Sequence, residues 1–332
     1  MNGHLSSKAD DRLLRKYVER VVADRTGSRL AIVGFQRKRI CYIGSYDCDT
    51  VTVQLANGEE FRFFLKDFGF SRRSKDNPEQ RRERELSVYR DLLVETDLGT
   101  PEYYGSIWNE SQGRFWLLLE FVEGIVIKDH NVEHGVIAAS WLGKMHGYFA
   151  QRLELLTGCD FLIRHDADFF RSKAELALLD IAQISALSAR RLAKIVDRYE
   201  QIINVMVSQP LTLVHGAYIP WHIVLDFTQE PVRVCPIDWE LAALGATLYD
   251  LAIFTDGVKP QTCDRIWDAY RQAAVQHNVP ISDGAQMRYV VDCFRLHRIF
   301  DWLSRSVEKQ FSAEKVTKLV DQAEQQSALV AV

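Results

Sequence analysis

The chain has 332 residues, of which 47% are hydrophobic, and its 41 basic and 45 acidic residues give a formal net charge of −4. A chain of this length and apolar content can bury one large core or two smaller ones. The slight acidity, without a basic stripe interleaved with aromatic residues, argues against a nucleic-acid-binding protein.

The sequence shows no motif typical of a membrane span, a signal peptide or a cysteine-based site. No run of about 18 uninterrupted apolar residues occurs, which argues against a membrane span, and the polar segment Met1–Asp11 does not resemble a signal peptide. The six cysteines show no CxxC spacing. We therefore expect reduced thiols in a cytoplasmic protein, and neither a zinc site nor a disulfide framework.

The apolar pattern changes along the N-terminal third of the chain. Lys8–Thr26 has apolar residues at helical spacing and predicts an amphipathic helix. Alternation then predicts short strands, with a hairpin turn at Ala56–Glu59. The expected strands are Ile40–Ile43, Thr50–Leu55, Glu60–Phe68, Tyr103–Trp108 and Phe115–Phe121, with a helix over Arg81–Val94 between the third and the fourth.

Helical periodicity dominates after Gly124. We expect helices over Val136–Gln151, Ser172–Leu187, Ala189–Val207, Thr262–Asn278, Asp283–Ser304 and Ala313–Ser327. The sequence thus predicts an α+β fold. It comprises an N-terminal helix (residues 1–29), a small antiparallel-sheet lobe (30–122) and a larger, mostly helical lobe (123–332), and we interpret the junction near Glu120–Gly124 as a hinge.

Two polar segments interrupt the helical part. Leu213–His222 lies between apolar runs, and Cys235–Glu240 places Asp238 directly after another apolar run. A polar loop followed by a lone carboxylate is the layout of a phosphoryl-transfer site, which uses a base, a second metal ligand and a metal-binding aspartate. His222 and Asp238 fit the two metal-binding roles, whereas Ala217 stands where the base is expected.

Lys66 ends an aromatic-rich run in the sheet lobe. Strand alternation places it on the face of Phe64 and Phe68, where an unpaired ammonium group would be costly. Glu85, in phase with the apolar side of the following helix, is the expected partner, and Glu83 is the competing one. An edge-strand lysine that reaches water is the alternative, but the downstream motifs favour a nucleotide-binding role.

These segments resemble the aminoglycoside phosphotransferase and choline kinase-like family. Its members read His-Gly-Asp-x-x-x-x-Asn, then an Ile-Asp-x-x segment and a Tyr-Asp-Leu-Ala segment. The chain has His215-Gly216-Ala217, then His222 in the Asn slot, Ile237-Asp238-Trp239-Glu240 and Tyr249-Asp250-Leu251-Ala252. Histidine in the Asn slot also occurs in the macrolide phosphotransferases of this family, whereas alanine in the aspartate slot departs from the pattern.

The resemblance implies a bilobal, protein kinase-like fold and an ATP- or GTP-dependent phosphotransferase that uses Mg²⁺. Its acceptor would be a hydroxyl group of a small molecule, such as an antibiotic or a sugar-like alcohol. By the same resemblance, Lys66 and Glu85 hold the nucleotide, His222 and Asp238 hold the metal, and His215 braces the loop. The excess of acids in the second lobe favours a cationic or neutral acceptor.

Two further nucleotide contacts are implied by position in the family pattern. The turn from Gly44 to Asp49 supports Gly44 and Ser45 as backbone contacts to the phosphates, although a plain hairpin turn fits its residues better. The apolar strand before the expected hinge would offer the main chain of Glu120 and Val122 to an adenine ring.

Alanine in place of the expected catalytic base at position 217 should lower the rate of phosphoryl transfer. Such a base contributes about 10² to 10⁴ in rate, or roughly 3 to 5.5 kcal/mol of barrier. We therefore expect Mg-ATP to bind but to react slowly or not at all. Ala217 is interpreted as an inactivating replacement in an active kinase, because Lys66 and Asp238 are retained. A natural nucleotide-binding pseudokinase acting as a scaffold, or a transferase of another group from ATP, are the alternatives.

Overall fold

The computed structural model describes residues 8–27, 31–40, 44–72, 75–127, 131–282 and 284–330. The chain divides into two compact units, Met1–Glu123 and Gly124–Val332. The first is built on a five-stranded antiparallel sheet and the second is mostly helical. The predicted fold class, a small antiparallel-sheet unit followed by a larger helical one, is confirmed.

The sheet of the first unit has the order β1-β2-β3-β5-β4, and all neighbouring strands are antiparallel. The β2–β3 turn falls at Ala56–Glu59, as predicted, and Gly58 adopts a φ of 89°, which favours glycine. The strands are β1 (Ile32–Arg39), β2 (Tyr46–Leu55), β3 (Glu60–Ser71), β4 (Tyr103–Asn109) and β5 (Arg114–Glu120), with a 3₁₀ turn, η2 (Glu110–Gln112), between the last two.

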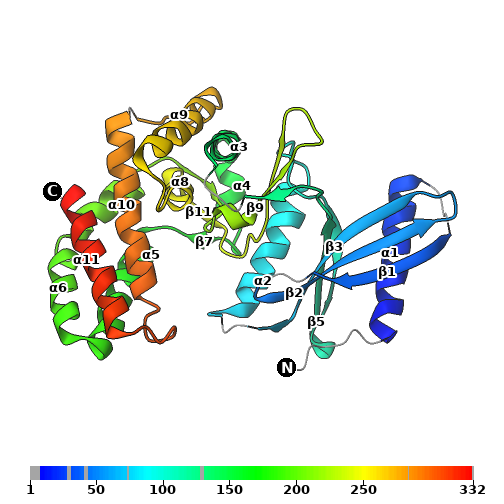
Figure 1. Ribbon diagram of the computed structural model, residues 1–332, viewed down its shortest axis with the longest axis horizontal. Coiled ribbons are helices and arrows are strands. Elements are labelled where there is room, and N and C mark those ends of the chain that lie inside the picture. Colours follow the sequence, from blue (N-terminus) through cyan, green and yellow to red (C-terminus); the bar gives the residue numbers. More distant parts are fainter. Residues whose placement is uncertain are drawn as a thin grey trace. The chain divides into compact units, whose positions relative to one another are not determined.

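Helices cover both faces of this sheet (Figure 1). The predicted N-terminal helix is α1 (Lys8–Thr26), whose apolar side packs on the core around Val51, Phe63 and Leu65. Because side chains alternate along a strand, Lys66 of β3 lies on the opposite face. That face packs against α2 (Pro78–Ser87), which continues as a π-helical turn, η1 (Val88–Leu93).

The structure contains a strand that the sequence pattern did not predict, β1 at Ile32–Arg39. Of the predicted strand Ile40–Ile43, Ile40 is not part of a strand, and Cys41–Ile43 fall outside the described residues. β1 is an edge strand with mostly polar and only partly buried side chains. An edge strand in that setting does not need the apolar alternation by which strands are recognised, so the sequence pattern missed it.

The second strand also begins earlier than expected. β2 starts at Tyr46, so the predicted turn from Gly44 to Asp49 is limited to its first two residues. Asp49 is buried in the strand and forms ion pairs of 2.6 Å with both Arg37 and Arg39 of β1. An acid that is paired across strands has the same sequence signature as an acid in a turn.

The second unit contains the expected long helices. α3 packs along α9, and α10 packs against α5, α8 and α11 (Figure 1). The helices are α3 (Val132–Ala150), α4 (Leu153–Thr157), α5 (Ala167–Ile184), α6 (Ala186–Val196), α7 (Tyr199–Val207), α8 (Leu248–Phe254), α9 (Pro260–Gln276), α10 (Gly284–Leu303) and α11 (Ala313–Leu329). No helix among the described residues is long and apolar enough to cross a membrane.

Two details of these helices differ from expectation. The helix predicted over Ala189–Val207 is two helices, α6 and α7, interrupted at Asp197–Arg198. α4 and α8 were not predicted, because helices of five and seven residues are too short to show a clear period.

Two three-stranded sheets, β10-β9-β6 and β7-β11-β8, lie among these helices. The apolar runs beside the two polar motifs form β8, β9 and β10, so both motifs lie in loops at strand ends. The strands are β6 (Ile125–Val126), β7 (Ile163–Arg164), β8 (Leu211–Val214), β9 (Ile223–Asp226), β10 (Arg233–Pro236) and β11 (Ala243–Ala246).

A buried histidine of α10 makes the stability of this core depend on pH. His297 is fully enclosed, and its Nδ1 lies 2.9 Å from the hydroxyl of Tyr199 on α7. Burial lowers the pKa of His297 well below its usual range, and the charges of His165 and Lys173 act in the same direction. Tyr249 of α8 also faces its ring. Below about pH 6.5 the unfolded chain therefore binds a proton that the folded chain excludes, so stability is lost on acidification.

We expect His297→Gln to reduce the fall in unfolding free energy between pH 6 and 5 by about 1.4 kcal/mol per pH unit. Urea unfolding at several pH values measures this slope. Tyr199→Phe is the matched control, because it removes the hydroxyl partner but keeps the histidine, so it should lower stability without reducing the slope. A wild-type slope in His297→Gln would contradict the assignment.

Candidate active site

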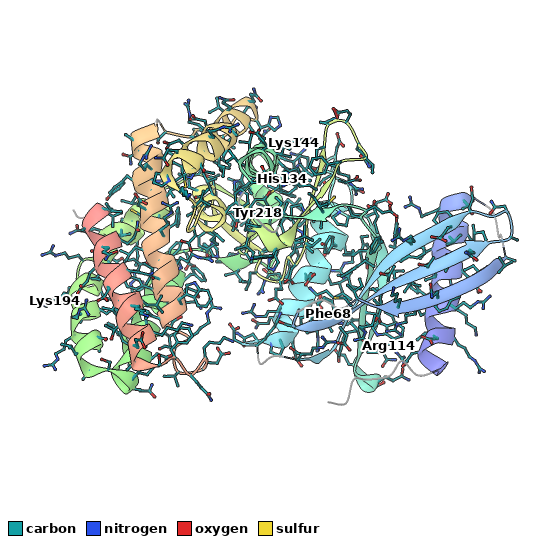
Figure 2. All side chains as sticks on the ribbon, viewed as in Figure 1. Phe68, Arg114, His134, Lys144, Lys194 and Tyr218 are labelled. Carbon is teal, nitrogen blue, oxygen red and sulfur yellow. The ribbon has the colours of Figure 1, made fainter. Side chains whose placement is uncertain are left out.

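The first unit contains a buried ion pair. Lys66 Nζ lies 2.8 and 2.7 Å from the two carboxylate oxygens of Glu85, and their side chains are only 10% and 2% exposed. The rings of Phe68 (Figure 2) and Tyr46 lie 5.1 and 5.6 Å from the ammonium nitrogen. The expected partner, Glu85, is thus the observed one, whereas Glu83 accepts a hydrogen bond from the Ser87 hydroxyl (3.5 Å).

The other expected nucleotide contacts of this unit lie at strand ends. The N–H of Glu120 donates to the carbonyl of Glu102 (2.9 Å), so it is occupied within the sheet. Val122 follows β5, and within the described residues its main chain has no hydrogen bond. Gly44 and Ser45 form a bend before β2, and the Ser45 carbonyl accepts from the N–H of Arg72 (2.7 Å).

The loop after β8 in the second unit is held by one carboxylate. Asp250, fully buried on α8, accepts hydrogen bonds from the N–H groups of His215 (2.6 Å) and Gly216 (2.9 Å). Gly216 has a φ of 76°, and a Cβ there would lie 2.1 Å from the carbonyl oxygen of Leu241. Only glycine fits this position.

His215 connects this loop to the segment that carries Asp238. Its Nε2 lies 3.0 Å from the carbonyl oxygen of Ile237, and its Nδ1 accepts from the N–H of Ala217 (3.3 Å). These contacts assign the neutral Nε2–H form. Burial lowers the pKa of His215 to about 4, against the opposing charges of Asp250 and Asp238. The residue braces the loop and is not placed to react.

Ala217 is fixed through its main chain. Its carbonyl oxygen lies 2.9 Å from Nδ1 of His222 and accepts from the N–H of Ile219 (2.8 Å). The following residue, Tyr218 (Figure 2), is buried and donates its hydroxyl proton to the Ala138 carbonyl (2.9 Å). The loop conformation therefore does not depend on the side chain at position 217.

His222 and Asp238 converge at the ends of β9 and β10. Nδ1 of His222 donates to the carbonyl oxygen of Ala217, and its Nε2 lies 3.4 Å from Oδ2 of Asp238. Asp238 has a φ of 69°, a conformation that is uncommon outside glycine and often found at functional sites. In the neutral Nδ1–H form of His222, Nε2 and the carboxylate oxygen both present lone pairs and can share a bound cation. A histidine nitrogen and a carboxylate oxygen are ligands that divalent metals accept, although Mg²⁺ prefers oxygen.

Asp226, an acid at the end of β9, has a structural role. It accepts hydrogen bonds from the N–H (2.9 Å) and the hydroxyl (2.6 Å) of Thr228, so it holds the turn after β9. Large aromatic side chains of the second unit differ in exposure. Trp239 is fully buried, whereas Trp221 and Trp302 are 52% and 41% exposed.

Sequence reasoning missed the partners that surround Asp250. His146 of α3 is fully buried, with Nε2 3.5 Å from Oδ2 of Asp250 and Nδ1 2.8 Å from the hydroxyl of Tyr270. Tyr270 in turn donates to the carbonyl of Thr247 (3.0 Å), just before α8. A histidine within the apolar run of α3 was the one available signal in the sequence.

Removal of the Asp250 carboxylate should be costly, because it leaves the buried N–H of His215 and the partly buried N–H of Gly216 without an acceptor. We expect Asp250→Ala to lower the free energy of unfolding by about 3 kcal/mol or more, and Asp250→Asn to lower it by less. Asp264→Ala is the control: its partner, Arg288, is half exposed, so the loss should stay within about 1 kcal/mol. Equal losses in Asp250→Ala and Asp264→Ala, measured by denaturant unfolding, would refute the bracing role.

Known structures share this fold. Aminoglycoside 2′-phosphotransferase-IIIa, as a mutant bound to GDP, aligns with a TM-score of 0.63 at 11% identity, over 95% of this chain and 97% of that one. A putative aminoglycoside phosphotransferase from Ralstonia eutropha gives 0.60 at 16%, over 95% and 96%. Macrolide 2′-phosphotransferase type I gives 0.59 at 15%, over 97% and 99%. The protein kinase-like fold expected from the sequence is confirmed.

The sequence carries its own family signal. No curated protein sequence matches the chain. The family model described as the phosphotransferase enzyme family matches residues 42–290, which include both the strand of Lys66 and the loops of His222 and Asp238. The chain belongs to the phosphotransferase enzyme family.

Proposed function

We propose that this chain binds a nucleoside triphosphate with a divalent cation, as a small-molecule O-phosphotransferase whose transfer step is impaired by Ala217. The observation that carries the proposal is the opposition of His222 Nε2 and Asp238 Oδ2 at 3.4 Å, beside a loop held in place without a side chain at position 217. The buried pair of Lys66 and Glu85 supports it, because an ammonium group positioned by a carboxylate is a recurring part of kinase sites.

Each proposed role follows from the chemistry of its group. Lys66 neutralises phosphate oxygens and Glu85 fixes its position. His222 and Asp238 hold Mg²⁺, which supplies charge neutralisation on the phosphates when bound. His215 keeps the loop in register with Asp238.

The main chain supplies the remaining nucleotide contacts in this proposal. Val122 has main-chain groups without partners among the described residues, so it suits the edge of an adenine or guanine ring better than Glu120, whose N–H is occupied. Gly44 and Ser45 are proposed to lie along the phosphates. ATP and GTP are both compatible with these contacts.

The acceptor is proposed to be a hydroxyl-bearing small molecule. Among structures of this fold, one is a complex of a phosphotransferase with GDP and kanamycin, another is a ternary complex with ADP and hygromycin B, and a third is an aminopropanol kinase. Kanamycin, hygromycin B and aminopropanol all carry hydroxyl groups. The excess of acids after residue 120 favours a neutral or cationic compound of this kind.

Mg-ATP should stabilise the folded chain. At a nucleotide concentration about 100 times Kd, the gain in unfolding free energy should be about 2.7 kcal/mol, and EDTA should remove most of it. Lys66→Met and Asp238→Asn should each weaken the effect, because each removes a charge that contacts the triphosphate or its metal. Thermal shift with ATP and GTP measures the gain.

Lys309→Met provides the control for these variants, since Lys309 pairs with its neighbour Glu308 at the surface. It should keep the wild-type response to nucleotide. A wild-type chain that is not stabilised by either nucleotide, with and without Mg²⁺, would overturn the proposal.

Ala217→Asp should restore transfer. The backbone around position 217 is fixed by His215 and His222, so the new carboxylate would enter a loop that is already in place. We expect an increase of about 10² to 10⁴ in turnover, measured as nucleotide-dependent phosphorylation of a panel of hydroxyl compounds. Ala217→Asn, which has the same shape but a much weaker base, is the matched control. If Ala217→Asp is no faster than Ala217→Asn on any acceptor, the impaired-kinase assignment is wrong.

Ala217 itself favours a second candidate, a nucleotide-binding scaffold without transferase activity. That function predicts nucleotide stabilisation in the wild type and no transfer even in Ala217→Asp. A transferase of another group is distinguished by labelled ATP, since the γ-phosphorus would then be absent from the product.

A further inference from the structure

A cavity of about 600 Å³ lies in the second unit, remote in sequence from the loops described above. It is walled by α10 and α11 and by Asp256, just beyond α8. Its volume falls within the range of small-molecule sites. Four of its lining residues carry charge: Asp256, Arg295, Arg298 and Lys315. They leave an excess of positive charge in a unit that is acidic as a whole.

The two arginines are held by the end of α8. Arg298 Nε donates to the carboxylate of Asp256 (2.9 Å). Arg295 donates to the carbonyl oxygen of Thr255 (2.9 Å) and pairs with Asp292 (3.3 Å), while its buried Nε has no hydrogen-bond partner in the described part of the chain. The guanidinium groups are therefore fixed in position before any ligand arrives, which lowers the entropy cost of binding.

Lys315 is the charge that is not compensated. Its Nζ lies 3.4 Å from the ring centroid of Phe311 and 5.9 Å from that of Trp302, and no carboxylate pairs with it within the described ranges. An ammonium group held over aromatic rings remains able to bind an anion.

Trp302 supplies a flat apolar surface in the same cavity. Its side chain lines the cavity and remains 41% exposed, with the Arg305 guanidinium group and the Lys315 ammonium group 5.8 and 5.9 Å from its ring centroid. The side chains of Gln322, Gln325 and Gln326 add amide donors and acceptors along α11. An aromatic surface beside surplus positive charge suits a ring that carries a negative group.

We propose that this cavity binds a small organic anion composed of a flat ring with a phosphate or carboxylate group. The ring packs on Trp302, and the anionic group lies against Lys315 and the guanidinium groups of Arg295 and Arg298. Such a ligand differs from the neutral or cationic hydroxyl acceptor of the proposed function. Because α8 also carries Asp250, the cavity and the loop of His215 are attached to the same short helix.

Phenyl phosphate is the probe that tests this site on the full chain, by calorimetry and by saturation-transfer NMR. Phenol has the ring without the charge, and inorganic phosphate has the charge without the ring, so both should bind at least about tenfold more weakly, a difference of about 1.4 kcal/mol. The double variant Lys315→Gln/Arg298→Gln should raise the Kd for phenyl phosphate by tenfold or more, and Trp302→Leu should remove the preference over inorganic phosphate.

Lys318→Gln is the matched control. It removes the same charge from the same helix, but Lys318 pairs with Glu314 and does not line the cavity. It should bind like the wild type, and so should Lys66→Met, whose lysine belongs to the proposed nucleotide site. No binding of phenyl phosphate to the wild type, equal loss in Lys318→Gln, or loss in Lys66→Met with retention in the double variant would each overturn the proposal. None of these outcomes depends on nucleotide binding or phosphoryl transfer.

Discussion

The carboxylate of Asp250 is the constraint on which the second unit's site depends. It accepts from two consecutive N–H groups, those of His215 and Gly216, in an environment that excludes water. With those two donors fixed, the His215 ring reaches the Ile237 carbonyl, and the loop is joined to the segment of Asp238. Hydrogen bonds to a buried carboxylate stabilise the fold strongly, because breaking them would leave buried polar groups without partners.

A buried ion pair organises the first unit. Lys66 and Glu85 come from β3 and α2, and neither charge would be stable alone at that depth. The pair thus requires α2 to pack on the face of the sheet opposite α1. This arrangement explains why an aromatic-rich strand tolerates a lysine.

The loop around Ala217 keeps its shape without a reactive side chain at that position. The contacts that shape it come from main-chain groups and from His215 and His222. In the proposed function the nucleotide and the metal are held by other residues, so a chain with alanine at position 217 would still hold its substrates where the transfer step is impaired.

The sequence by itself determined the fold class, the long helices and the pairing of Lys66 with Glu85. Periodicity, motif order and the cost of an unpaired buried lysine are local properties, and they suffice for such inferences. Only the tertiary structure decided that Asp250 accepts from the N–H groups of His215 and Gly216, that His146 lies against it, and that Asp49 is paired inside a strand. Those facts depend on contacts between residues far apart in the chain, and no local pattern encodes the distance between two such side chains.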